Sequence, residues 1–170
     1  MSDLEGRARA WIADDPDPST RAELERLLAD PSAQAKAELK HRFAGRLRFG
    51  TAGLRGAVAA GPNRMNRAVV RTATAALAAW LDEHVPAARQ AGVVVGCDAR
   101  HGSAEFDEDV ALVLTGAGFH VHLLERQRPT PLLAFAVLHL GAAAGVMITA
   151  GFREMSGMDG QSVRIGGQVR

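Results

Sequence analysis

The sequence predicts an α/β domain with three layers, helix–sheet–helix, preceded by an N-terminal helical arm. Two observations lead to this prediction. Between residues 92 and 149, short apolar runs bounded by glycine alternate with helical patterns, which is typical of a layered sheet with helices on both faces. Before them, residues 1–46 carry helical patterns broken by proline. We therefore divide the chain into a helical arm over residues 1–46, the α/β domain over 47–150 and a divergent glycine-rich tail over 151–170.

The composition is that of a globular protein. Of the 170 residues, 47% are hydrophobic, and 20 basic residues nearly balance 19 acidic ones. Neither a nucleic acid nor a membrane is therefore expected as a partner. The single cysteine, Cys97, excludes an internal disulfide framework and fits a reducing cytosol. We find no secretory signal and no stretch of the ~20 apolar residues that span a bilayer, so a cytoplasmic location is expected. No feature indicates an oligomeric state.

The arm is expected to consist of short helices that pack on the main domain. Trp11 and Ile12 belong to the first helix, which ends at the prolines of segment 14–18. Thr20 and Glu23 match a capping box at the start of the next helix. A third helical pattern leads into the glycine-rich motif. An arm that binds a partner is the alternative interpretation.

Residues 48–56, Arg-Phe-Gly-Thr-Ala-Gly-Leu-Arg-Gly, are the stretch most indicative of ligand binding. Three glycines let a ligand approach the backbone closely. Backbone N–H groups and guanidinium groups are the donors that a phosphate oxyanion needs. We expect a phosphate-binding loop in which Phe49 and Leu54 are buried. A dinucleotide site fits poorly, because the glycine spacing differs from Gly-x-Gly-x-x-Gly and the motif precedes the clear strands.

The elements that follow alternate in type. Residues 61–66 have the composition of a turn, and Asn66 is a plausible N-cap of a helix that ends near residue 85. Residues 92–97 are expected to form a fully buried strand, followed by the polar segment 98–100 at its carboxyl end, which is where ligands bind in open α/β sheets. Ser103 is expected to cap the next helix.

The other half of the domain repeats the alternation. Residues 119–124 are expected to form a strand. Thr130 and Pro131 are expected to be the N-cap and the first position of a helix that ends at Gly141. Residues 145–149 are expected to form a third strand. From residue 151 the periodicity is lost, and we expect a largely irregular tail with at most one short strand over 163–165.

Several residues with reactive side chains have simpler interpretations. Cys97 is expected to act as a small buried hydrophobe, and Asp98 to brace its loop rather than bind metal. His120 and His122 lie on the same face of one strand, but without a third ligand ordinary packing is expected rather than a metal site. Ser156 and Ser162 lack the position and the neighbouring base that a nucleophile needs.

Five segments of the chain together carry a family resemblance. They are, in chain order, Phe49–Gly56, Gly61–Asn66, Val95–Arg100 with Ser103, Arg128–Pro131 with Phe135, and Gly145–Ala150. In this order and at this spacing they resemble the N-terminal part of the α-D-phosphohexomutases, the phosphoglucomutase/phosphomannomutase superfamily. Segment 61–66 is most similar to the branch that includes phosphopentomutases. The resemblance covers roughly residues 5–150.

The resemblance implies the fold of phosphohexomutase domain I and an intramolecular phosphoryl transfer on hexose or pentose phosphates. In that family a phosphoserine near Mg²⁺ exchanges its phosphoryl group with the sugar. By position, Arg55 would lie beside the phosphoserine, while Thr51, Gly53 and Arg100 would line the phosphate and substrate cleft. The family's metal-binding loop belongs to a second domain, so no metal ligand is assigned in this chain.

The resemblance stops at residue 151. In the family, the strand runs directly into Ser-His-Asn-Pro, and the serine carries the phosphoryl group. Here Gly151, Phe152 and Arg153 take the first three positions, and glycine has no hydroxyl. The abrupt change indicates a truncated or frameshifted reading, and we expect little or no mutase activity from this chain. A non-catalytic module that binds phosphosugars or anions, and an inert truncated product, are the alternatives.

Overall fold

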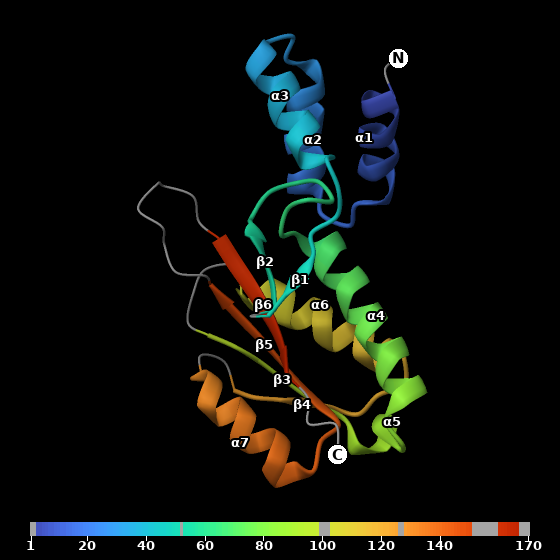
Figure 1. Ribbon diagram of the computed structural model, residues 1–170, viewed down its shortest axis with the longest axis vertical. Coiled ribbons are helices and arrows are strands. Elements are labelled where there is room, and N and C mark those ends of the chain that lie inside the picture. The colour runs from blue at the N-terminus through green and yellow to red at the C-terminus, as the bar shows by residue number, and fades with distance from the viewer. Residues whose placement is uncertain (1–2, 52, 99–102, 126–127, 151–159, 167–170) are drawn as a thin grey trace.

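The computed structural model describes residues 3–51, 53–98, 103–125, 128–150 and 160–166. A six-stranded sheet carries helices on both faces, and three further helices form an arm beyond one end of the sheet (Figure 1). The predicted three-layer α/β architecture is confirmed. None of the helices in the described ranges is both long and apolar enough to cross a membrane.

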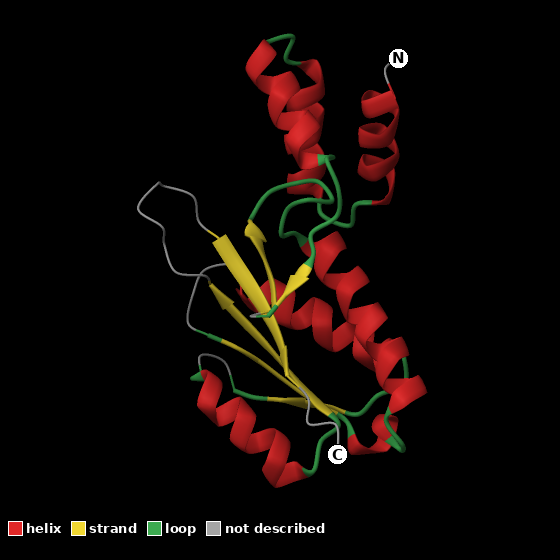
Figure 2. Cartoon of the chain, in the orientation of Figure 1, coloured by secondary structure: helices red, strands yellow, loops and turns green. Residues whose placement is uncertain are grey.

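Figure 2 distinguishes the helices from the strands and loops. The helices are α1 (Asp3–Asp14), α2 (Pro18–Ala29), α3 (Ala33–Arg42), α4 (Arg67–His84), α5 (Ala88–Ala91), α6 (Ser103–Gly116) and α7 (Thr130–Leu140). The strands are β1 (Phe49–Gly50), β2 (Gly53–Ala57), β3 (Val93–Cys97), β4 (Val121–Leu123), β5 (Ala144–Ala150) and β6 (Gly160–Gly166).

The sheet combines a parallel and an antiparallel half. Its strand order is β1-β2-β6-β5-β3-β4. The strand β3 is parallel to β4 and β5, whereas β6 is antiparallel to both β5 and β2. The short strand expected over residues 163–165 is therefore confirmed, and it is longer than expected, because β6 covers residues 160–166 and fills the gap between the two halves. Its other partner, β2, lies far earlier in the chain, and such a long-range pairing is hard to predict from local patterns.

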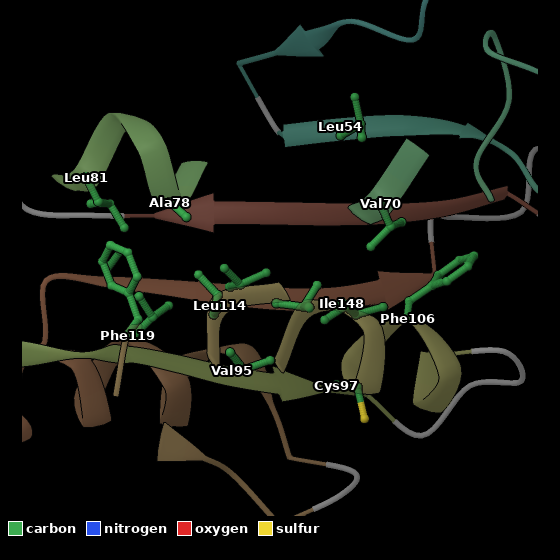
Figure 3. Packing of buried hydrophobic residues seen from close by; sticks show 14 of the residues in the cluster. Leu54, Val70, Ala78, Leu81, Val95, Cys97, Phe106, Leu114, Phe119 and Ile148 are labelled. Atoms are coloured by element: carbon green, nitrogen blue, oxygen red, sulfur yellow. The ribbon is translucent and has the colours of Figure 1, made fainter. Parts of the chain in front are cut away.

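Alternate residues of the central strands enter two separate cores. Val146 and Ile148 of β5 pack with α4 and α6 on one face of the sheet, where Figure 3 shows Ile148 beside Val70 and Phe106. Met147 packs on the opposite face against Leu133 of α7. This alternation follows from the pleat of a strand, and it explains why the buried strands have continuous apolar sequences.

The arm has a small core of its own, built around Leu24 and Phe43. It is tied to the segment after β2, because the carboxylate of Glu23 accepts hydrogen bonds from Arg42 at 2.6 Å and from the backbone N–H of Ala60 at 3.0 Å. The predicted capping box is wrong, since Asp17 is the N-cap of α2 and Glu23 faces the domain instead.

The ends of the main helices agree with the sequence signals more closely. The Asn66 side chain accepts from the Val69 N–H at 3.0 Å and caps α4, as predicted. Gly141 ends α7 with φ 64°, a left-handed conformation that favours glycine. The start of α7 lies one residue earlier than predicted, with Pro129 as N-cap and Thr130 in the first turn.

Replacement of Val163 by proline tests the role of β6. Val163 pairs with Leu54 of β2 and Ile148 of β5, and proline cannot donate a ladder hydrogen bond in a central strand. We expect Val163→Pro to lower the free energy of unfolding by about 3 kcal/mol, measured by urea denaturation. Gln168→Pro, beyond the end of β6, is the matched control and should change little. Equal stability of the two variants would show that β6 does not hold the sheet together.

Candidate functional site

The candidate site is built around Arg55 in the middle of β2. Its neighbour Leu54 is only 2% exposed and belongs to the main core. Because side chains alternate along a strand, Arg55 projects from the opposite face of the sheet, where it is exposed. Within the described part of the chain, no carboxylate pairs with Arg55, so its guanidinium is available to an anion.

The glycine motif forms a tight β-hairpin rather than an open loop. Gly50 and Gly53 pair across its end, and Gly53 has φ 92°, a conformation that other residues resist. Thr51 is exposed in the turn. A Cβ atom on Gly56 would lie 2.9 Å from Leu47 Cδ1, so a side chain there would displace the preceding segment. Phe49 is 51% exposed, and the prediction that it is buried is wrong, although Leu54 is buried as expected.

The sheet register brings Arg55 level with the end of β5. Arg55 pairs with Ser162 of β6, and Ser162 pairs in turn with Thr149 of β5. Arg55 and Thr149 therefore lie two strand spacings apart, about 10 Å between backbones. β5 ends at Ala150, and Gly151, the predicted nucleophile position, comes next but lies outside the described residues.

The carboxyl ends of β3 and β5 are joined at the same edge of the sheet. The Asp98 N–H donates to the Ile148 carbonyl at 3.0 Å, and the Arg128 N–H donates to the Cys97 carbonyl at 3.2 Å. The backbone of Asp98 thus anchors the start of its loop. Arg128 also pairs with Glu125. Arg100, the other predicted cleft cation, lies outside the described residues.

No metal can be assigned to this site from the residues whose placement is described. Among them, no group of three His, Cys, Asp or Glu side chains could hold a metal ion. His122 packs against the start of β3, where its Nε2 atom would be 2.9 Å from a Cβ on Gly92. Cys97 is 3% exposed at the end of β3. The described residues therefore do not fit a Mg²⁺ site, and we derive no step through one.

A buried ion-pair cluster behind the site was not predicted. The carboxylate of Asp109 on α6 is fully buried and accepts from Arg67 Nε at 2.7 Å and Nη2 at 2.9 Å, and from Arg71 Nε at 2.7 Å. Burial alone would raise the pKa of Asp109, but the hydrogen bonds from the two arginines outweigh it and hold this pKa below its usual range. The cluster fastens α6, which follows the loop at the end of β3, to α4.

One signal in the sequence could have indicated this cluster. Arg67 and Arg71 are four residues apart, so they lie on the same face of a helix. Asp109 itself is one of several acidic residues near the start of α6, and the local sequence does not distinguish it from the others. Its burial depends on the packing of α6 against α4, which no local pattern specifies.

The sheet with helices on both faces, and the exposed arginine level with a strand end, define an α/β/α domain. A family profile described as phosphoglucomutase/phosphomannomutase, alpha/beta/alpha domain I, matches residues 46–151. The chain belongs to this family of phosphomutases, and the resemblance seen in the sequence is confirmed.

Individual relatives agree with that assignment. The chain is 42% identical over 140 residues to a Schizosaccharomyces pombe protein assigned as a phosphoribomutase, covering 82% of this chain and 23% of the relative. It is 33% identical over 153 residues to human phosphopentomutase, covering 86% and 24%. A crystal structure from Thermus thermophilus, assigned as a phosphomannomutase, superposes with a TM-score of 0.62 at 35% identity, covering 72% of this chain and 26% of that one. The chain thus spans about a quarter of the length of these relatives.

Replacement of Asp109 by asparagine tests the cluster. We expect Asp109→Asn to lower the free energy of unfolding at pH 7 by about 3 kcal/mol, because two partly buried guanidinium groups lose their counter-charge. A carboxyl whose pKa is lowered by folding contributes stability above its unfolded pKa of about 3.9 and loses it as the pH falls through the folded value. The difference between wild type and variant should therefore be constant from about pH 7 to 5 and shrink below about pH 4.

The control for this experiment is the surface ion pair between Asp82 and Arg89. Its Nε–Oδ1 distance is 2.6 Å, but both side chains are nearly half exposed. Asp82→Asn should change stability much less than Asp109→Asn in the same urea titrations. Equal effects of the two substitutions would contradict a special role for the buried cluster.

Proposed function

We propose that this chain forms the phosphate-binding wall of a sugar-phosphate mutase site, with Arg55 as its principal cation. The observation that supports the proposal is the register of three strands, which sets Arg55 beside Ser162 and level with Thr149 at the end of β5. In the family resemblance, the residue after Ala150 is the phosphoryl carrier.

The chemistry of Arg55 suits that role. A guanidinium group offers paired N–H donors that match two phosphoryl oxygens. In phosphoryl transfer, charge is spread over the equatorial oxygens, and a positioned cation stabilises it. Thr51 and the backbone around Gly53, at the exposed turn of the same hairpin, are proposed to line the cleft. Arg100 is proposed as a further cation from the loop after β3.

In this proposal, the glycine at position 151 prevents turnover but not the binding of a sugar phosphate. Glycine has no hydroxyl group, so the chain cannot form the phosphoseryl intermediate at that position. We propose that the family reaction is an intramolecular phosphoryl transfer on hexose or pentose phosphates, and that this chain alone binds sugar phosphates without isomerising them. Mg²⁺, which the family resemblance implies, is not assigned to any residue of this chain.

A binding measurement tests the role of Arg55. We expect calorimetric titration with glucose 1-phosphate and ribose 5-phosphate to show binding that Arg55→Ala weakens at least about tenfold, because a charged hydrogen-bonding group is removed. Arg48→Ala is the matched control, since Arg48 is an exposed arginine in the same motif but precedes the hairpin. Equal losses in both variants, or no binding by the wild type, would contradict the proposed site.

An activity measurement tests the other half of the proposal. We expect no conversion of glucose 1-phosphate to glucose 6-phosphate by the purified chain in the presence of Mg²⁺ and glucose 1,6-bisphosphate. Turnover that is abolished in Arg55→Ala would show that another residue replaces the serine, and would overturn the assignment of Gly151 as the inactivating position. Because the titration does not depend on turnover, the two halves can fail separately.

A further inference from the structure

A groove runs along α4 on the helix-covered side of the β1–β2 hairpin. It consists of two adjoining hollows of about 620 and 680 Å³. Four residues border both hollows and so mark where they meet: Trp11, Arg46, Pro62 and Thr72. We call this the α4 groove. Each hollow lies within the size range of small-molecule sites, roughly 300–1,000 Å³.

The two ends of the α4 groove differ in character. The hollow nearer the hairpin is apolar, lined by residues such as Leu54 and Leu77, and is bordered by Trp80 and Phe49, which are 43% and 51% exposed. Apart from Arg46 and Thr72 at the junction, every residue that lines this hollow is apolar.

The hollow nearer the arm contains the charged groups, and most of them are already satisfied. Arg71 is paired with Asp109. Arg7 donates to the Phe43 carbonyl at 2.7 Å. Asp15, which is 3% exposed, accepts hydrogen bonds from Trp11 Nε1 at 3.2 Å and Thr20 Oγ1 at 2.8 Å.

Arg46, where the two hollows meet, takes no part in these hydrogen bonds and ion pairs among the described residues. It is exposed and has no ion-pair partner within the described part of the chain. Asp14, exposed at the end of α1, is the one acid lining the hollow that is neither buried nor hydrogen-bonded among the described residues. Its charge limits the site to a ligand with a single small anionic head rather than a polyanion.

We propose that the α4 groove binds a small amphipathic anion, with its carboxylate at Arg46 and its apolar body in the hollow between the hairpin and α4. The charge at the junction and the apolar lining beyond it match such a ligand end to end. Leu54 borders the groove, whereas Arg55 projects from the opposite face of the same strand. The groove is therefore separate from the proposed phosphate site and does not depend on it.

The tryptophans provide a direct readout of occupancy. The chain has two Trp and no Tyr, and both Trp11 and Trp80 border the apolar hollow. Decanoate, titrated below its critical micelle concentration at one fixed pH, is expected to shift the tryptophan emission in a saturable manner. Trp80 stacks on His84 with ring centroids 4.8 Å apart, so the pH is held constant and the ligand is the only change in the surroundings of Trp80. Aryl ligands are tested in parallel with 1-naphthoate, so that the two kinds of apolar body are distinguished.

Three comparisons decide the proposal. Arg46→Ala should weaken decanoate binding at least about fivefold, whereas Arg48→Ala, two residues away and outside the groove, should leave it unchanged. Decanol, which has the same chain without the charge, should bind as weakly to the wild type as decanoate does to Arg46→Ala. Ala76→Leu, which adds a larger helix-forming side chain to the exposed apolar lining, should abolish binding without lowering the melting temperature.

The contrary results are equally specific. Equal affinity of decanoate for wild type and Arg46→Ala, or of decanol and decanoate for the wild type, would show that Arg46 does not select the head group. Unchanged binding in a folded Ala76→Leu variant would show that the apolar hollow is not the site. Absence of any saturable change with both decanoate and 1-naphthoate would overturn the proposal as a whole.

Discussion

The arrangement of this domain depends on one strand, β6, which joins two halves of the sheet whose strands do not pair directly with each other. In the described sheet, β2 pairs only with β1 and β6, and the parallel strands β3 and β4 reach the hairpin only through β5 and β6. Backbone groups on both sides of β6 would face an apolar interior without partners if it were absent, which is costly. The hairpin and its arginine are thus placed by a segment at the far end of the chain.

Because β6 positions the hairpin through backbone pairing, the proposed site can keep its geometry when a reactive side chain is replaced. The β6 register sets Arg55 level with the end of β5 through backbone pairing, and backbone pairing makes little demand on which side chains occupy the connection between β5 and β6. In the proposed site, glycine in place of serine at position 151 removes a hydroxyl group without removing a strand.

Sequence patterns correctly predicted the strands and helix ends that depend on residues close together in the chain. The apolar runs at residues 93–97 and 144–150 are strands, and Asn66 caps α4. The errors concern long-range contacts. Glu23 was assigned to a cap because no local signal shows that Arg42 and Ala60 approach it. The prediction that Phe49 is buried is wrong because its exposure depends on how the hairpin packs against α4, which no local pattern specifies. For the site, Arg55 could be singled out from its motif, but neither Asp109 nor the register of β6 could.

The hairpin connects the two surfaces to which we assign ligands. Successive residues of β2 serve different faces, with Leu54 in the core beside the α4 groove and Arg55 on the open face. Gly56 is in close contact with Leu47, which also lines the groove. A ligand that displaced Leu54 would have to move the strand that carries Arg55, because both residues belong to β2. Two sites on opposite faces of one short strand can therefore influence each other without a shared residue, and the strength of that coupling is limited by how firmly β6 holds β2 in register.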